Sequence, residues 1–443
     1  MSRRYRAAFA MALGFSPLAV SRADAVPAFA EQTGQPCATC HIGAFGPHLT
    51  PFGRQFKLSG YTQRTGGFSP PVSATAIVSF LHTDKDQPPP PPPHYARNDN
   101  ATIDIIQLFF AGGFGEHFGT LTDFTYDGVG RSFHWDDMDV RAVERAKLWG
   151  EDLVYGLSLN NEPTGQDVWA TLPIWGFPFN TSDLAPSPAA ATQLSGKFAQ
   201  NVLGLSAYAW WNSEVYAEFG LYRSLSAGML RFVGEKPDET NLIDGFAPYF
   251  RLAYQKDYTN QNFEVGTFGL FPSLFPGRDK NIGLTDDYAD FGADASYEYL
   301  GNNENIFTAN ARYTHEDQGL HASNFLGAAS NTDDSLDEFV INGSYYWKNL
   351  VGGSIGHFQT WGSTDPLFYA SNRSFKPNTA GFFFQVDTAP FRDKSDFPTR
   401  LNLRIGLQYI AYTEFDGASS NFDGAGRNAS DNNSIRLFLW GAF

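Results

Sequence analysis

Apolar and polar residues alternate along most of the chain after residue 71, and this period of two residues limits the possible folds more than any other feature. In the stretch 214–221, Val, Ala, Phe and Leu occupy alternate positions, and Glu, Tyr, Glu and Gly occupy the positions between them. The stretch 401–408 repeats the pattern with leucine and isoleucine on one face. Because successive side chains of a β-strand point to opposite faces, each stretch is predicted to form a strand with one apolar and one polar face.

About sixteen such stretches follow one another, an even number, as in bacterial outer-membrane barrels. The connections between them alternate between short turns and long loops, and only the short connection 128–131 breaks this rhythm. The predicted strands are 72–83, 101–114, 117–127, 132–146, 152–161, 198–210, 213–225, 245–257, 260–271, 287–301, 304–315, 335–347, 350–361, 378–390, 398–413 and 432–443.

A closed membrane barrel explains this rhythm, because outer-membrane barrels have short periplasmic turns and longer external loops. A soluble β-sandwich or propeller has no reason to sort its loops in this way. The 41 Phe, 20 Tyr and 43 Gly are typical of aromatic-rich β-structure, and the terminal Phe443 resembles the assembly signal of outer-membrane barrels. The sequence therefore predicts an all-β fold, a transmembrane outer-membrane β-barrel of about 16 antiparallel strands over residues 70–443.

The first 25 residues are predicted to be a secretory signal peptide. Three arginines precede an apolar run over 7–20, and Ala23-Asp24-Ala25 matches a cleavage site of small residues. Without these residues the chain carries 27 basic and 46 acidic residues, a net charge of −19. So acidic a chain argues against nucleic acid as a partner, although it could attract cations.

Residues 26–69 contain Cys37-Ala38-Thr39-Cys40-His41, the attachment pattern of a c-type haem. Two thiols at this spacing can each form a thioether to one porphyrin, and the next imidazole can bind the iron. The alternatives are a thioredoxin-type disulfide, which would need a βαβ context, and half of a zinc site, which would need further ligands nearby. We predict one covalent haem c in a small cytochrome segment over 26–69 that plugs the lumen of the barrel.

The residues around this motif resemble the N-terminus of the fused monohaem cytochrome-porins found in the outer membrane of iron-oxidising bacteria. The resemblance rests on Gln32-Thr33-Gly34 and on the stretch 49–61, LTPFGRQFKLSGY. It implies that the cytochrome segment takes electrons from an extracellular donor such as Fe(II) and passes them to a periplasmic c-type cytochrome or another acceptor. By position, Cys37 and Cys40 are then the thioether anchors and His41 is the proximal ligand.

The second axial ligand is less constrained by the sequence. His48 follows His41 closely enough to return over the other face of the haem, but a histidine without that role, with the position vacant or filled by water, is the alternative. A methionine ligand would have to be Met138 or Met229. Arg54 and Lys57 are predicted either to pair with the haem propionates or to pair with acidic residues of the lumen.

Two other stretches carry hypotheses. His134, Asp136, Asp137 and Asp139 could bind a metal ion, although alternation would send neighbouring side chains to opposite faces. The loop 162–197, rich in aromatic residues and proline, is predicted to form a structural constriction of the pore or, alternatively, a substrate site.

Electron transfer through the outer membrane is the leading functional prediction. The alternatives are a porin or solute channel gated by its haem and, less favoured, a haem peroxidase. A peroxidase would need an open iron position beside an acid–base residue, a role that His48 could fill.

Overall fold

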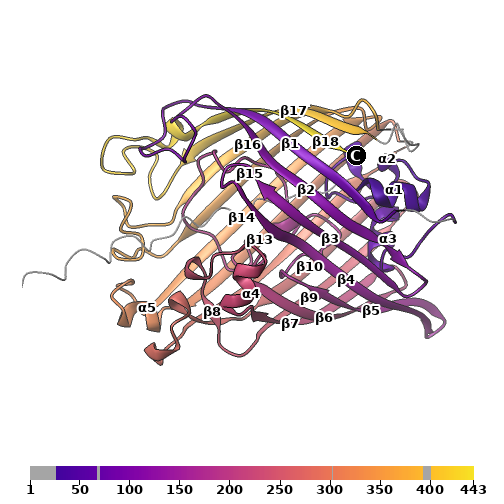
Figure 1. The fold of residues 1–443 in the computed structure, drawn as a ribbon, viewed down its shortest axis with the longest axis horizontal. Coiled ribbons are helices and arrows are strands. Elements are labelled where there is room, and N and C mark those ends of the chain that lie inside the picture. The colour runs from indigo at the N-terminus through magenta and orange to yellow at the C-terminus, as the bar shows by residue number, and fades with distance from the viewer. Residues whose placement is uncertain (1–25, 67–69, 302, 393–400) are drawn as a thin grey trace, which may run out of the picture.

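The computed structural model describes residues 26–66, 70–301, 303–392 and 401–443, so the predicted signal peptide lies outside the described residues. Within these ranges, sixteen long antiparallel strands form one barrel, and the pairing of the first strand with the last closes it. Figure 1 shows the barrel from the side. The fold class predicted from the sequence is thus confirmed.

The long strands agree closely with the predicted stretches. They are β1 (Val72–Thr83), β2 (Asn100–Phe114), β3 (Phe118–Asp127), β4 (Ser132–Leu148), β5 (Glu151–Asn160), β6 (Val202–Trp211), β7 (Val215–Ser224), β9 (Ala247–Asp257), β10 (Gln261–Leu270), β12 (Asp286–Tyr299), β13 (Asn305–Gly319), β14 (Asp333–Trp347), β15 (Val351–Gly362), β16 (Thr379–Thr388), β17 (Asn402–Glu414) and β18 (Ser434–Ala442). Two further short strands, β8 (Leu242–Ile243) and β11 (Ser273–Phe275), pair with each other and were not predicted.

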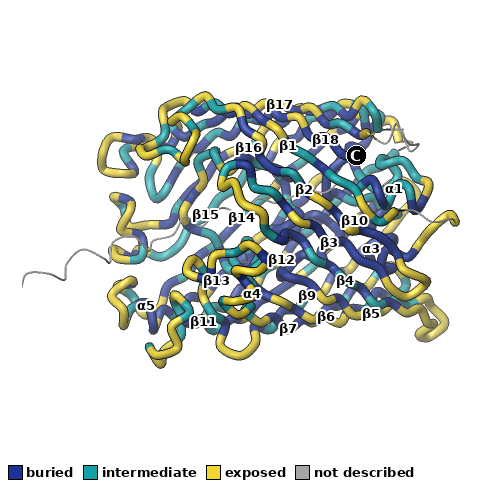
Figure 2. Tube along the Cα trace, in the orientation of Figure 1, coloured by how far each residue is buried: buried dark blue, intermediate teal, exposed yellow. Residues whose placement is uncertain are grey.

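The alternation sorts side chains between the outside of the barrel and its lumen. On β18, Ile435, Leu437 and Leu439 are 41–53% exposed, whereas Arg436 and Phe438 between them are buried. Figure 2 shows the same alternation of buried and exposed positions along the strands. An outward face of leucine, isoleucine and aromatic residues, around an inward face rich in polar groups, is the construction of a barrel that spans the lipid of a bacterial outer membrane.

The two ends of the barrel differ. The turns between β2 and β3, β4 and β5, and β14 and β15 are short and lie at one end, together with the C-terminus, whereas the long loops lie at the other end (Figure 1). By the general arrangement of such barrels, the short-turn end faces the periplasm. No helix in the described part of the chain is long and apolar enough to cross a membrane.

A helical segment, residues 26–66, lies at the short-turn end (Figure 1). It comprises α1 (Pro27–Thr33), α2 (Cys37–Cys40), the 3₁₀ turn η1 (Ile42–Ala44) and α3 (Pro51–Leu58). Hydrogen bonds fix it to the barrel, because the Asn402 side chain donates to the Ala44 carbonyl at 2.9 Å and the Gly43 amide donates to Asn349 Oδ1 at 2.8 Å. A segment this small cannot bury a sufficient apolar core of its own, so it depends on its contacts with the barrel wall.

The loop between β5 and β6, residues 161–201, folds into the lumen. Its residues 161–172 are all buried, η2 (Pro173–Trp175) follows them, and polar groups of the loop form hydrogen bonds to strands on several sides of the barrel. Trp169 Nε1 donates to Gln255 on β9 at 2.7 Å, and Gln408 on β17 donates to the Asn180 carbonyl at 3.3 Å. This lumen loop contains residues 162–197, for which the sequence predicts a constriction of the pore.

The external loops contain the remaining helical turns of the described chain. These are α4 (Ala227–Phe232), η3 (Pro237–Glu239), η4 (Pro276–Arg278), η5 (Lys280–Ile282), α5 (His321–Phe325) and η6 (Ala429–Asn432).

Candidate haem site at the periplasmic opening

The two cysteines lie one helical turn apart on α2, and both are free thiols that are partly exposed. Residues three apart share a face of a helix, so both sulfur atoms can serve one ligand. Burial raises the pKa of both thiols, that of Cys40 to about 12. A thioredoxin-type cysteine has the opposite character, a lowered pKa. Among the described residues no three His, Cys, Asp or Glu side chains are grouped to hold a metal ion, so the zinc alternative lacks its further ligands.

His41 follows α2 directly, and its amide donates to the Cys37 carbonyl at 2.9 Å. Its Nδ1 is buried without a hydrogen-bond partner among the described residues, although the residue as a whole is partly exposed. Burial lowers the pKa of His41 to about 4; a hydrogen bond to the Gly46 backbone opposes this shift, and His48 adds a smaller lowering. The imidazole is therefore neutral near pH 7, which is the form that binds a metal.

Thr50 ties the next helix to the cysteine helix. It is the N-cap of α3, accepting from the Gly53 amide at 3.3 Å, and Pro51 takes the first helical position. Its hydroxyl donates to the Thr39 carbonyl at 2.6 Å, and its amide donates to the Cys40 carbonyl at 2.9 Å. A Cβ on Gly53 would overlap the Cys40 carbonyl oxygen, so only glycine permits this approach. Sequence reasoning missed these roles, although Thr-Pro before a helix is a start signal.

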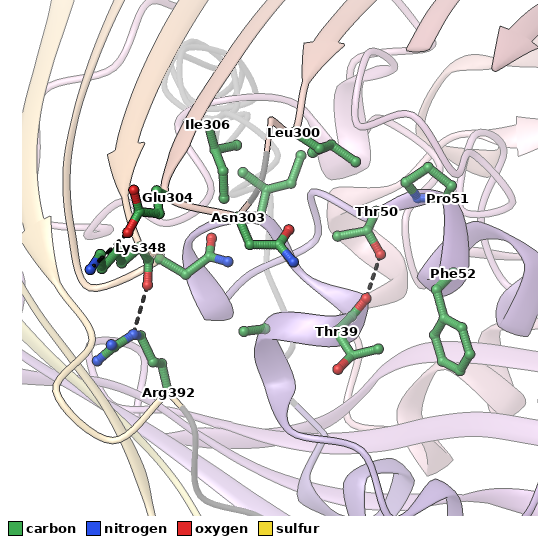
Figure 3. Close-up of a pocket in the computed structure, with 13 residues that line it drawn as sticks. Thr39, Thr50, Pro51, Phe52, Leu300, Asn303, Glu304, Ile306, Lys348 and Arg392 are labelled. Carbon is green, nitrogen blue, oxygen red and sulfur yellow. Dashed lines mark hydrogen bonds and ion pairs between the residues drawn. The ribbon is translucent and has the colours of Figure 1, made fainter. Parts of the chain in front are cut away.

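A cavity of about 600 Å³ lies beside α2 and has the size of a small-molecule or cofactor pocket. Figure 3 shows its wall, to which α2 contributes Ala38 and Thr39 but neither cysteine, and to which turns of the barrel also contribute. Its lining residues are Ala38, Thr39, Ile42, Thr50, Pro51, Phe52, Leu300, Asn303, Glu304, Ile306, Lys348, Asn349 and Arg392.

His48 belongs to the same helical segment and lies between η1 and α3. The pairs His41 with Leu49 and Ile42 with His48 form a short antiparallel bridge, in which neighbouring side chains leave on opposite faces. His48 is buried, and its Nε2 lies 3.2 Å from Glu298 Oε1 on β12. Its place as second axial ligand remains a prediction, which these contacts do not favour.

Arg54 has an acidic partner in the lumen, the predicted alternative to a propionate, whereas Lys57 bonds backbone carbonyls of the lumen loop. The Arg54 guanidinium is fully buried and donates to both carboxylate oxygens of Glu298, at 2.7 and 3.0 Å. Lys57 donates to the carbonyls of Gly165 at 2.8 Å and Asp167 at 3.1 Å in the lumen loop.

The two methionines considered as haem ligands do not lie at α2, and the residues considered as a separate metal site do not form one in the described structure. Met229 lies on α4 in an external loop, at the opposite end of the barrel (Figure 1). Met138 lies on β4 next to Asp139, whose carboxylate accepts from Tyr61 inside the lumen at 2.5 Å, so alternation directs Met138 outward. The residues His134 to Asp139 form no metal-binding group within the described structure, which does not support that hypothesis.

No known protein-family model matches the sequence, and a search of curated proteins by sequence found no match. Solved structures of similar fold include an anion-selective porin from Comamonas acidovorans, with 12% identity, a TM-score of 0.44 and coverage of 84% of this chain and 99% of that chain. The outer-membrane channel DcaP of Acinetobacter baumannii has 9% identity, a TM-score of 0.46 and coverage of 84% and 96%. The outer-membrane protein OmpT of Vibrio cholerae has 9% identity, a TM-score of 0.43 and coverage of 84% and 96%.

Proposed function

We propose that this outer-membrane barrel carries one haem c, bound through Cys37 and Cys40 with His41 as an axial ligand, and that it transfers electrons. The observation that carries the proposal is the arrangement of the motif: two free thiols lie one turn apart on α2, and His41 follows directly with a buried Nδ1 that has no hydrogen-bond partner among the described residues. The residues fit the group, because both thiols are free and the neighbouring imidazole is neutral. When bound, a haem supplies one-electron exchange between ferric and ferrous iron.

The chain's own residues hold this site in one geometry. Thr50 and Gly53 bring α3 against the end of α2, and the amide of His41 closes the turn that carries the cysteines. Below them, the ion pair between Arg54 and Glu298 fixes α3 to the barrel wall. Such support sets the orientation of the imidazole and limits the access of water.

The position of the cavity favours a periplasmic partner. A periplasmic c-type cytochrome or another acceptor can approach the short-turn end from outside the barrel, whereas the lumen loop lies between the helical segment and the long external loops. We therefore propose direct electron exchange with a periplasmic protein. An extracellular donor such as Fe(II) fits the same proposal if the lumen loop gives it a path, and the acidic lumen would attract such a cation.

A solute channel is the second candidate, because a sixteen-strand barrel with a polar lumen is wide enough to conduct when it is not filled. The similar solved structures named above are described as porins, channels or outer-membrane proteins. In this reading the helical segment and the lumen loop would be gates. Peroxidase chemistry is not carried further, because the one predicted acid–base group, His48, contacts Glu298.

The test uses the full-length protein purified in detergent and rebuilt into sealed vesicles that hold an electron acceptor. Haem spectra and haem staining after denaturing electrophoresis report covalent haem, and the Cys37→Ala/Cys40→Ala double variant is the control. Reduction of the internal acceptor after an external reductant, Fe(II) included, supports electron transfer. A purified protein without covalent haem, with conductance in planar bilayers, would replace this proposal by the channel.

A further inference from the structure

We propose that Arg223, at the external end of β7, binds a phosphate group of lipopolysaccharide in the outer leaflet of the membrane. The inference concerns the lipid-facing side of the barrel and does not depend on haem. Arg223 combines three features in the described structure: it faces the lipid near the external edge, it lacks an acidic partner, and apolar side chains surround it.

The position of Arg223 follows from the alternation along β7. Phe219 and Leu221 face the lipid and are 54% and 39% exposed, whereas Tyr222 is buried. Arg223 is the next lipid-facing position, and it is exposed. It lies eight positions after Val215, which begins β7 at the short-turn end, so the tilted strand raises it by about 20 Å across the membrane. Since the apolar band of such barrels is about 25 Å tall, Arg223 lies near the outer edge of the lipid.

The guanidinium of Arg223 has no acidic partner among the residues that the structure describes. Its carbon atom lies 5.7 Å from the centre of the Phe246 ring, a cation–π contact that restricts the side chain. By contrast, His315 also faces the lipid toward the external end, and its Nδ1 lies 2.7 Å from Asp337 Oδ1. A guanidinium that lacks a carboxylate matches a phosphate by paired, charge-assisted hydrogen bonds. Lipopolysaccharide presents phosphates at this level of the outer leaflet.

Arg278 brings a second positive charge to the same end of β7. Its guanidinium donates to the Leu225 carbonyl, two residues after Arg223. It also donates to the Thr240 hydroxyl at 2.9 Å and to the Asn241 carbonyl at 3.3 Å. These partners are neutral oxygens, and no carboxylate in the described ranges pairs with Arg278. Two guanidinium groups without carboxylates thus lie close together in a chain whose net charge is −16, which favours an anion at this place.

The surface next to the two arginines fits acyl chains. Phe246, Leu252 and Phe271 are 55%, 50% and 39% exposed on the lipid-facing side of β9 and β10. The rings of Phe250 and Phe271 stack there, with their centres 6.3 Å apart. A phosphorylated headgroup joined to acyl chains uses both the charged and the apolar surface, whereas free phosphate would leave the apolar surface unused.

The test counts bound lipid by native mass spectrometry, as purified lipopolysaccharide is added to the full-length protein in detergent. Arg223→Gln is compared with Arg373→Gln, a matched control because Arg373 is an exposed arginine in the external loop between β15 and β16. Loss of the charge-assisted bonds should raise the Kd for lipopolysaccharide about tenfold in Arg223→Gln, and Arg373→Gln should bind as the wild type does. Lipopolysaccharide stripped of its phosphates should bind the wild type as weakly as the intact lipid binds Arg223→Gln.

Equal Kd values for the wild type and Arg223→Gln would overturn the proposal. An equal loss in both arginine variants would also overturn it, since the total charge would then be the cause. Inorganic phosphate that binds as tightly as lipopolysaccharide would show that the ligand is not the lipid. If Arg223→Gln fails to fold, which heat-modified migration on a gel would show, Phe246→Ala replaces it, and loss of the cation–π contact should then weaken binding about twofold to fivefold.

Discussion

Replacement of Arg54 by leucine should release the helical segment from the barrel. The Arg54 guanidinium donates to Glu298 at 2.7 and 3.0 Å and to the Leu49 carbonyl at 2.8 Å, and both ionic side chains are fully buried. Removing one partner of a buried ion pair costs about 3–5 kcal/mol, because the remaining charge is left without its partner. At about 1.4 kcal/mol for each tenfold change, the undocked state should become at least about a hundredfold more populated.

Limited proteolysis of the purified protein in detergent measures this population. When the segment opens and closes quickly relative to cleavage, the rate of cleavage between residue 66 and β1 follows the undocked fraction. The barrel itself is monitored by its heat-modified migration, so loss of the barrel is distinguished from loss of docking.

The double variant Arg54→Leu/Glu298→Leu is the matched control, because removal of both charges leaves no unpaired ion. It should recover most of the protection that the single variant loses. Wild-type cleavage rates in Arg54→Leu, or equally fast cleavage in the single and double variants, would refute the reasoning.

Three further outcomes are expected. Cys37→Ala/Cys40→Ala should abolish haem staining on denaturing gels, since no thioether can form, and persistent staining would contradict the attachment site. Glu338→Gln weakens charge-assisted bonds to the lumen loop, including the one from the Thr192 amide at 2.8 Å, by about 1.5–3 kcal/mol; bilayer conductance should rise or fluctuate, and unchanged conductance would show that the loop is not the barrier. Burial lowers the pKa of Lys57 from 10.5 to about 8, so the unfolded chain binds more protons between these values and stability should rise with pH there by up to about 3 kcal/mol. Lys57→Met should remove this rise in denaturant unfolding curves, and an equal slope in both proteins would show that another group causes it.

The strands could be predicted because each one carries its own evidence. A lipid-facing apolar position alternates with a lumen-facing polar one, and short turns fix the register of each hairpin, so β1 begins and ends at the predicted residues. The predicted strands differ from the observed ones where this alternation of apolar and polar residues no longer determines the structure. The strand expected from 198 begins at Val202, because residues 196–201 belong to the lumen loop. The pairing of β8 with β11 joins two long loops, which no periodicity records.

The candidate site also has a part that the sequence predicts and a part that only the folded structure reveals. Cys37, Cys40 and His41 are adjacent in sequence, so their common location follows from the motif alone. The partner of Arg54 is 244 residues away, and no local pattern distinguishes Glu298 from the other carboxylates of the lumen. Lys348 stands in a turn that, by sequence, is an ordinary polar hairpin. Such contacts are set by the closure of the barrel, and they appear only when its strands are placed around the helical segment.

The asymmetry of the barrel links these parts into one functional argument. The cavity lies at the short-turn end, because its lining includes residues of the helical segment and of the turn between β14 and β15. Toward the other end, the amides of residues 192–194 each donate to a carboxylate on a different strand, β14, β13 and β12 in turn. Three neighbouring strands thus hold one stretch of the lumen loop across the path from outside. In the proposed functions, a solute or an external electron donor would pass this stretch, whereas a periplasmic partner would not. The two proposed functions therefore differ in which end of the barrel has to open.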